Sequence, residues 1–377
     1  MIALARKTLI YEWRRFVPVV LAVGFSGLML VAQAALVLGI FGTAAIYVKA
    51  SSADLWVGYP GTQSVNFGQS IDPDVAMRLR MDPDVVDVEP YEWVDGDWRA
   101  QASDSGSVSV YLSGVSVSDG AMMFDQLLSA DMRARLREPG AVIVDEADLQ
   151  TLGLNRDVSR AWINGKPVRV VGLLRGLRGL GGVNVLASVD TAREVKGDSD
   201  VRGSTYYVAR TRIAPELVKA RLNDGTTAFG PYEVWTADQF ASRSQRYWLL
   251  DTGAGMAVLF MALIVCLVGA VITNQSFAAV VAGSAREYAT LNALGASRTA
   301  LARVVIEQSC MVGGMGMVLA AVISSALLAL AAFYHVPVAM TPLVALACAV
   351  LVGLMSLLSS VMAVRALWRT DPSLLLR

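Results

Sequence analysis

Four long apolar runs alternate with polar segments along the chain. The runs cover residues 16–46, 249–272, 304–333 and 342–364, and each meets the length of about 20 residues that a membrane-spanning helix needs. A long polar segment of mixed character, residues 47–248, follows the first run. This pattern predicts an α+β membrane protein with four transmembrane helices and a large mixed α/β domain between helices 1 and 2.

Overall composition agrees, because 55% of the 377 residues are hydrophobic, more than the roughly 45–50% of soluble domains. All ten Lys and Arg residues outside 47–248 lie in segments 1–15, 273–303 and 365–377. Basic residues near span ends mark the cytoplasmic side, so we expect both termini and residues 273–303 to be cytoplasmic. The chain is then a multi-pass protein of the inner membrane, with residues 47–248 and the short loop 334–341 on the outer side.

The first run has a second interpretation as a cleaved signal peptide, because Ala32-Gln33-Ala34 resembles a cleavage site. Apolar sequence continues beyond it through Ile40. Cleavage would leave an apolar new terminus and an odd number of spans. We therefore favour an uncleaved anchor.

The segment 47–248 has the turn and capping signals of a folded domain. Asp72-Pro73-Asp74 is typical of a helix start, and it predicts a helix over 73–80, whereas Asp82-Pro83-Asp84 runs directly into a strand at 85–88. Asn164-Gly165 predicts a hairpin turn between strands 161–163 and 166–171. Runs rich in β-branched residues predict further strands at 107–117, 141–144, 166–174 and 205–210, and we expect a short helix at 145–154 and a loop at 177–183.

The residue types that most catalytic sites need are scarce. The chain has one histidine, His335, and its three cysteines, Cys266, Cys310 and Cys348, all lie in apolar runs, where cysteine behaves as a small apolar residue. A single histidine supports neither a zinc site nor a Ser-His-Asp arrangement, and no glycine loop followed by Lys-Ser/Thr is present. We expect a non-catalytic chain that binds no metal and no cofactor of its own.

Two features of the spans stand out. Arg303 and Glu307 are four residues apart, so they can form an ion pair on one helix face, although an intramembrane carboxylate is also a functional candidate. Small residues allow close approach of helices, and we expect helix packing, within the chain or between two copies, at Gly24, Gly27, Gly313, Gly314 and Gly316.

A charged, helix-forming segment between the second and third runs is the most informative stretch. It ends at a glycine that can stop a helix, and Ser297 can cap the helix that follows. Such a segment can act as a lever for force applied in the cytoplasm, or it can lie on the lipid surface as an amphipathic helix. The residues that we expect to couple the chain to a cytoplasmic partner are Arg286, Glu287, Tyr288, Leu291, Leu294, Gly295 and Ala296.

The sequence Arg286-Glu287-Tyr288-Ala289-Thr290-Leu291-Asn292-Ala293-Leu294-Gly295-Ala296-Ser297 closely resembles a segment of the FtsX-like, MacB-type permeases of ABC transporters. The tail from Arg365, with Asp371-Pro372 and a final Leu376-Arg377, is similar to that family's closing pattern. Residues 53–62 and 141–146 are similar to its outer domain, and the layout is closest to DevC-like subunits. The resemblance thus covers the whole chain.

This resemblance implies a MacB-like periplasmic core in residues 47–248 and a permease that works as a homodimer. ATP and Mg would be bound by a separate ATPase dimer that docks on the coupling segment and drives movement of the outer domain, known as mechanotransmission. It also implies tripartite efflux with a membrane-fusion protein and an outer-membrane channel. The alternatives are extraction of a lipid, lipoprotein or haem from the membrane, and FtsX-like regulation of an outer-face enzyme.

Overall fold

The computed structural model describes residues 11–101, 106–154, 160–177, 179, 181–197, 203–224, 229–284, 287, 290, 297–334 and 336–369. The chain divides into two compact units, one formed by Met1–Ile40 with Ala254–Arg377 and one formed by Phe41–Gly253. We call them the helical unit and the sheet unit.

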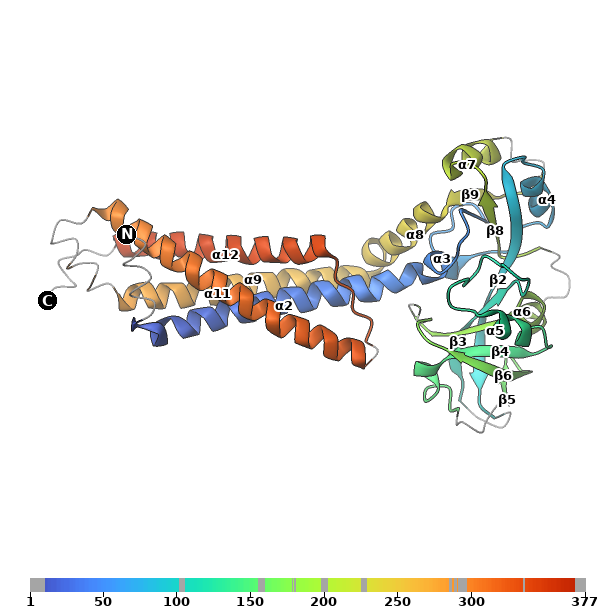
Figure 1. Cartoon of the computed structure of the whole chain (residues 1–377), viewed down its shortest axis with the longest axis horizontal. Coiled ribbons are helices and arrows are strands. Elements are labelled where there is room, and N and C mark those ends of the chain that lie inside the picture. Colours follow the sequence, from blue (N-terminus) through green and yellow to red (C-terminus); the bar gives the residue numbers. More distant parts are fainter. Residues whose placement is uncertain are drawn as a thin grey trace. The chain divides into compact units, whose positions relative to one another are not determined.

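The helical unit contains four long helices, shown in Figure 1: α2 (Trp13–Gly42), α9 (Gly253–Gly283), α11 (Arg298–Phe333) and α12 (Pro342–Arg369). Each is long and apolar enough to cross a membrane, so the chain is a membrane protein. The four predicted spans and the mixed α/β domain between the first and second are confirmed. Helix α11 begins before the apolar run because the Ser297 hydroxyl accepts a bond of 3.2 Å from the Ala300 amide.

The core of the helical unit is a seam of valines and phenylalanines. Phe16, Val19 and Val23 of α2 meet Phe277 of α9 and Val312 of α11 in one buried cluster. Helix α9 contributes little to this core, because only 6% of its most apolar window is buried. Most of its circumference therefore faces outward from the chain.

The sheet unit is built around one long strand, β2 (Val85–Arg99). Its first half pairs antiparallel with β8 (Tyr206–Thr211), and β8 leads on to β1 (Leu55–Gly58) and β9 (Glu233–Thr236) in a four-stranded antiparallel sheet. Its second half enters a separate array of strands. A single strand thus belongs to two substructures.

That second array closes into a six-stranded barrel. From β2 the order runs through β3 (Val108–Val115), β7 (Val183–Ser188), β4 (Ala141–Asp145), β6 (Lys166–Leu174) and β5 (Arg160–Ile163), and β5 pairs again with β2 at Trp98 and Arg99. The pairs β3–β7 and β4–β6 are parallel and the others antiparallel. Closure removes the free edges at which other chains could pair.

Short helices complete the sheet unit. They are η1 (Thr43–Ala45), α3 (Ile46–Lys49), η2 (Val65–Phe67), α4 (Asp74–Arg80), α5 (Ala130–Arg135), η3 (Glu146–Asp148), α6 (Val189–Lys196), α7 (Pro215–Asn223), α8 (Ala237–Arg246) and the π-helix η5 (Tyr247–Asp251).

Several predicted local features are present in the sheet unit. The Asp72 carboxylate accepts a bond of 2.9 Å from the Asp74 amide, and Asp82 does the same for Asp84 at 3.0 Å. The helix expected over 145–154 is wrong in length, because only η3 forms. The Asp145 side chain accepts from the Ala147 amide and from the Leu177 amide, so it turns the chain instead of opening a longer helix.

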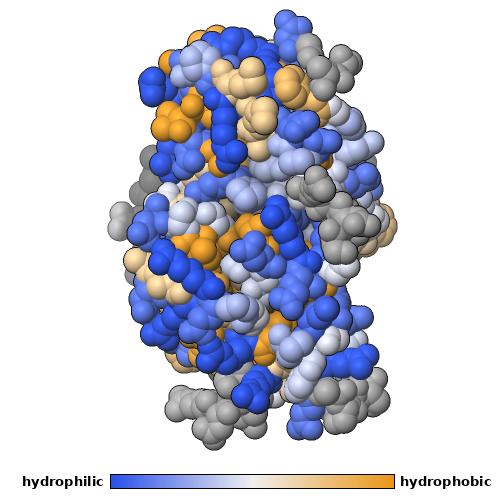
Figure 2. Space-filling view, turned by 90° about the vertical axis from the view of Figure 1, so that its right-hand side faces the viewer, coloured by the Kyte–Doolittle hydropathy of each residue, from blue (hydrophilic) through white to orange (hydrophobic). Residues whose placement is uncertain are grey.

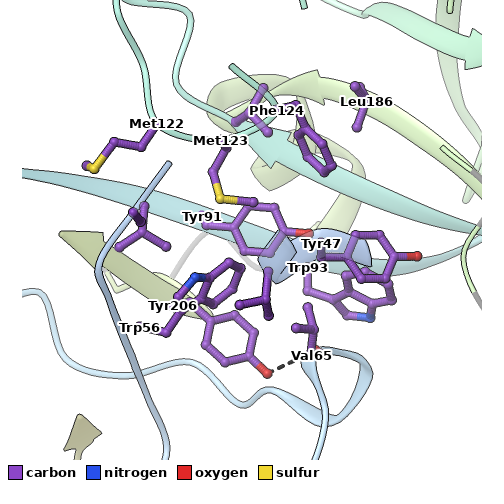
Figure 3. Close-up of a cluster of buried hydrophobic side chains, with 14 of the residues drawn as sticks. Tyr47, Trp56, Val65, Tyr91, Trp93, Met122, Met123, Phe124, Leu186 and Tyr206 are labelled. Carbon is purple, nitrogen blue, oxygen red and sulfur yellow. Dashed lines mark hydrogen bonds between the residues drawn. The ribbon is translucent and has the colours of Figure 1, made fainter. Parts of the chain in front are cut away.

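Aromatic rings fill the core between the four-stranded sheet and the barrel, as Figure 3 shows. Trp56 packs against Tyr91 and Tyr206 with ring centroids 5.5 and 5.6 Å apart. Burial raises the pKa of both tyrosines, which keeps their hydroxyls neutral, and Tyr206 donates to the Val65 carbonyl at 2.9 Å. The surface of the sheet unit in Figure 2 is mainly hydrophilic with separate hydrophobic patches, as expected of a domain in water.

Candidate functional site

The predicted coupling segment is described in part only. Glu287 lies in a described position, whereas Arg286, Tyr288, Leu291, Leu294, Gly295 and Ala296 lie outside the described residues. Glu287 pairs with Arg15 near the start of α2, with 3.0 Å between Oε1 and Nη1. The same guanidinium donates to the Gly283 carbonyl at 3.1 Å, and it pairs with Glu12 at 2.7 Å. Arg15 therefore joins the start of α2 to the end of α9 and to the coupling segment.

Glycines bring α2 and α11 into close contact. A Cβ added to Gly316 would lie 2.7 Å from the Val23 Cβ, one on Gly24 would lie 2.9 Å from Leu319 Cδ2, and one on Gly27 would lie 2.8 Å from the Ala320 Cβ. Real Cβ atoms essentially never approach other atoms this closely. The two helices thus pack without room for even a methyl group at three levels of the seam.

The loop between α11 and α12 continues this contact at the far end of α2. A Cβ on Gly39 would lie 2.5 Å from the Pro337 carbonyl carbon and 2.6 Å from the Val338 Cα, and it would clash with the Pro337 carbonyl oxygen. The Ala339 amide donates to the Ala35 carbonyl at 3.1 Å. The sequence predicts only a short connection here, and the structure shows that the backbone of this loop packs against α2.

The five glycines predicted for helix packing have different surroundings. Gly24, Gly27 and Gly316 pack in the α2–α11 seam, and Gly313 faces α12, where a Cβ would lie 2.7 Å from the Ser356 Oγ. An added Cβ at Gly314 would meet nothing within 4 Å. Four of the five therefore serve packing within one chain, and Gly314 alone leaves an open face.

The predicted ion pair between Arg303 and Glu307 stays a prediction. Arg303 is exposed, and the Glu307 Oε2 is buried without a hydrogen-bond partner among the described residues. The spacing of four residues permits contact but does not enforce it. A long side chain near a helix start can instead extend toward water, and Arg303 lies at such a position in α11.

The sheet unit holds the helical continuation of α2 in its core. The backbone stays helical from α2 through η1 and α3 to Lys49. Tyr47 of α3 is fully buried, its ring lies edge-on to Trp93 with centroids 4.8 Å apart, and its hydroxyl donates to the Asn184 Oδ1. The segment that leads out of α2 is thus fixed to strands β2 and β7.

The return connection is different. Helix α8 passes into the π-helix η5, and Thr252 is extended (φ −94°, ψ 145°) before α9 begins at Gly253. The π-helix is uncommon and often occurs at functional positions. Of the two connections between the units, the first is helical throughout and the second contains a break.

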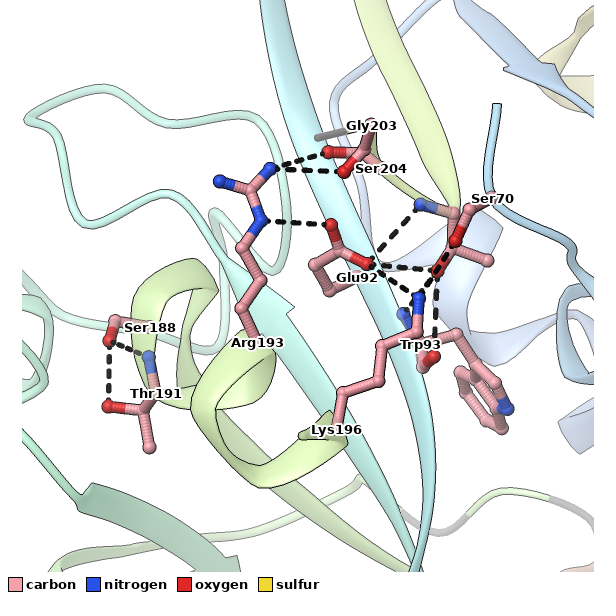
Figure 4. A network of polar contacts seen from close by, with 10 residues as sticks. Ser70, Glu92, Trp93, Ser188, Thr191, Arg193, Lys196, Gly203 and Ser204 are labelled. Carbon is pink, nitrogen blue, oxygen red and sulfur yellow. Dashed lines mark hydrogen bonds and ion pairs between the residues drawn. The ribbon is translucent and has the colours of Figure 1, made fainter. Parts of the chain in front are cut away.

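A buried carboxylate joins the barrel to the four-stranded sheet, as Figure 4 shows. Glu92 of β2 is 1% exposed. Its Oε1 accepts from Arg193 of α6 at 3.2 Å, and its Oε2 accepts from the Thr205 hydroxyl at 3.1 Å and lies 3.7 Å from the Lys196 Nζ. Arg193 in turn donates to the Ser204 hydroxyl at 3.0 Å. The network links a barrel helix to residues that lead into β8.

The part of the chain that the structure describes has no cluster of side chains that could bind a metal ion and no disulfide. No group of three His, Cys, Asp or Glu side chains there could hold a metal ion. The cysteines lie apart on three helices, Cys266 on α9, Cys310 on α11 and Cys348 on α12.

A comparison with known families finds a match in part of the helical unit. Residues 259–372 match the family model of the FtsX-like permease C-terminal domain. No curated protein matches the whole sequence significantly.

Three solved structures share likeness with part of the chain. The periplasmic region of MacB from Actinobacillus actinomycetemcomitans is 13% identical, with a TM-score of 0.35, and the match covers 52% of this chain and 94% of that structure. The extracellular domain of the noncanonic ABC-type transporter YknZ from Gram-positive bacteria is 16% identical over 49% and 100%, with a TM-score of 0.32. A domain of a putative permease protein from Porphyromonas gingivalis is 11% identical over 48% and 88%, with a TM-score of 0.34. Residues 259–372 are thus similar to the C-terminal domain of FtsX-like permeases.

Proposed function

We propose that the chain is the membrane-spanning, non-catalytic subunit of an ABC-type exporter. A separate ATPase dimer docks on the segment around residues 286–294, and ATP binding and hydrolysis there move the sheet unit on the outer face of the inner membrane. Both termini are cytoplasmic in this arrangement. The partners beyond the ATPase are a second copy of the chain, a membrane-fusion protein and an outer-membrane channel.

The observation that carries the proposal is the continuous contact between α2 and α11. Helix α11 follows the coupling segment directly, from the cap at Ser297. It packs on α2 through glycine contacts and through the loop pinned at Gly39. Close-packed elements move together because their interfaces are not continuously deformable, so displacement of α11 displaces α2.

From α2, the helical backbone leads to Tyr47 in the core of the sheet unit. Movement of α2 along its axis is therefore transmitted to β2 and β7 through the Tyr47 contacts. The break at Thr252 gives the second connection the freedom to adjust. One connection drives the outer domain and the other follows it.

Helix α9 supports the pairing with a second copy. It is the most apolar of the four spans, with a mean hydropathy of 2.8, yet its most apolar window is only 6% buried. Close packing is the main source of helix association inside a membrane. The exposed circumference of α9 suits a partner helix from the second copy.

The test reverses the charges of the Arg15–Glu287 pair in the chain reconstituted with its ATPase in proteoliposomes. Both side chains are partly exposed, at 42% and 50%, and such a pair contributes on the order of 0.2–1 kcal/mol. Arg15→Glu and Glu287→Arg are each expected to lower permease-stimulated ATP hydrolysis by about 1.4- to fivefold. The double variant should recover part of the loss seen in Arg15→Glu, because a glutamate at position 15 pairs with an arginine at position 287 but cannot donate to the Gly283 carbonyl and lies beside Glu12.

Arg14→Glu is the matched control, because Arg14 lies over the Trp13 ring instead. Its stimulation should equal that of the unaltered chain. The role of the pair in coupling is refuted if the double variant stays as low as the singles, or if Arg14→Glu is equally impaired. Leu294→Asp tests docking of the ATPase separately and should abolish stimulation while the protein still inserts.

A further inference from the structure

A cavity of about 260 Å³ lies between α2, α11 and α12. Small and apolar side chains from all three helices form its wall, among them Gly27, Val31, Ala321, Ala349 and Cys348. All of these residues belong to the helical unit. Ala321 and Ala349 are exposed, so the cavity opens at the surface of the helices.

One polar group in the wall has no partner. Ser324 is 3% exposed, and its hydroxyl makes no hydrogen bond to any described residue. Two other buried serines in these helices bond to a carbonyl of the preceding turn, Ser26 to Ala22 at 2.8 Å and Ser309 to Val305 at 2.8 Å, whereas Ser360 of α12, which is not part of the wall, also lacks a partner among the described residues. A buried hydroxyl that forgoes this bond is poised to bond with something in the cavity.

Water fits the cavity poorly. A buried water needs two to four polar partners, and the side chains of the wall offer it two hydroxyls, of which that of Ser325 can only accept because it donates to the Val322 carbonyl at 2.8 Å. An apolar molecule with one oxygen atom fits better. The volume corresponds to about nine water-sized groups at roughly 30 Å³ each.

The depth of Ser324 narrows the class of ligand. At 1.5 Å per residue, it lies about 13 Å along α11 from the helix end at Phe333. The ester oxygens of a bilayer phospholipid lie near the membrane surface, so an ordinary acyl tail brings no oxygen to this level. The ligand must carry its own oxygen into the hydrocarbon region.

We propose that this cavity is a binding site for a medium-chain lipophilic alcohol or carbonyl compound, whose oxygen accepts a hydrogen bond from Ser324. The apolar part of the ligand packs against the alanines of α11 and α12. This site is independent of ATPase coupling, so the two proposals can fail separately.

The test uses photolabelling of the full chain in detergent, without ATPase. Two diazirine probes of equal length are compared, a derivative of octanol and a derivative of octane, and adducts are mapped to peptides by mass spectrometry. The octanol probe should label peptides from 321–328 and 345–352, and unlabelled octanol should compete. The octane probe should label them at least threefold less.

Variants separate the cavity from the lipid-facing surface. Ala349→Leu fills the cavity and should lower octanol labelling at least fivefold, and Ala321→Leu, from the facing helix, should do the same. Ala347→Leu is the matched control, since Ala347 is exposed on α12 but is not part of the wall, and it should leave labelling unchanged. Ser324→Ala should reduce octanol labelling to the level of octane.

Three results would overturn the proposal. One is equal labelling by the two probes in the unaltered chain, which would mean that bilayer hydrocarbon alone enters the cavity. Another is labelling spread over exposed positions of α9, such as Leu263 and Leu267, with no effect of Ala349→Leu or Ala321→Leu. The third is full octanol labelling in Ser324→Ala.

Discussion

Replacing Gly39 by alanine tests whether the loop between α11 and α12 holds α2. The new methyl group would lie 2.5 Å from the Pro337 carbonyl carbon, and real Cβ atoms essentially never come within 3.0 Å. The loop must therefore retreat by at least about 0.5 Å, which an overpacked site resists. Rotation of a side chain cannot relieve this clash, because the obstacle is backbone.

Gly42→Ala is the natural comparison. Gly42 is in the same helix, and an added Cβ there would meet nothing within 4 Å. Both substitutions gain about 1 kcal/mol of helix propensity, so this gain cancels between them. What remains is the clash, about 1–3 kcal/mol, and weakening of the bond from Ala339 to Ala35, about 1 kcal/mol.

We therefore expect Gly39→Ala to be less stable than Gly42→Ala by about 2–4 kcal/mol. Thermal unfolding in detergent compares the two, and proteoliposomes with the ATPase report transport. Gly39→Ala should keep ATP hydrolysis but lower transport, because the loop no longer carries movement to α2 and only the glycine contacts between α2 and α11 remain. Equal stability of the two variants, together with normal transport in Gly39→Ala, would refute the reasoning.

Two further predictions concern the sheet unit. Glu92→Ala removes the carboxylate that Arg193 faces and should lower the free energy of unfolding in denaturant by about 3–5 kcal/mol. Glu138→Ala, whose ion pair is exposed, should lower it by less than about 1 kcal/mol. Similar losses in both variants would contradict the role of the Glu92 network. Burial raises the pKa of Glu89, so the folded state binds its proton more tightly than the unfolded state, and stability should fall as the pH rises from about 4.5 through the raised pKa. Glu89→Gln keeps an acceptor for the Met122 amide, and it should flatten this part of a melting-temperature profile against pH; an unchanged profile would assign the dependence to another group.

The four spans could be predicted because a long apolar run has few alternatives to a membrane helix. Local turn signals were also reliable, as at Asp72 and Asn164, because their hydrogen bonds involve only neighbouring residues. The predicted strand 85–88 is shorter than β2, which runs to Arg99. The prediction stops early because Glu89, Pro90 and Glu92 interrupt the apolar pattern. Contacts from other elements satisfy these residues, and sequence patterns do not reveal such contacts.

The candidate site was predicted less completely for the same reason. The sequence shows which glycines could allow two helices to approach, but it does not show which helix each glycine faces. Arg15 was counted only as a basic residue of the N-terminal segment, although it pairs with Glu287, which is 272 positions away. For Glu307, the spacing to Arg303 indicates reach and not the rotamer that the surroundings select.

The course of β2 limits how this protein can be recombined with its relatives. Because one strand of 15 residues runs through both the four-stranded sheet and the barrel, neither can be exchanged alone without cutting a paired strand. A chimaera that grafts only the barrel should misfold. Grafts with junctions near Phe41 and Gly253, where the two compact units meet in sequence, keep β2 whole, so the sheet unit would have to be exchanged as a whole.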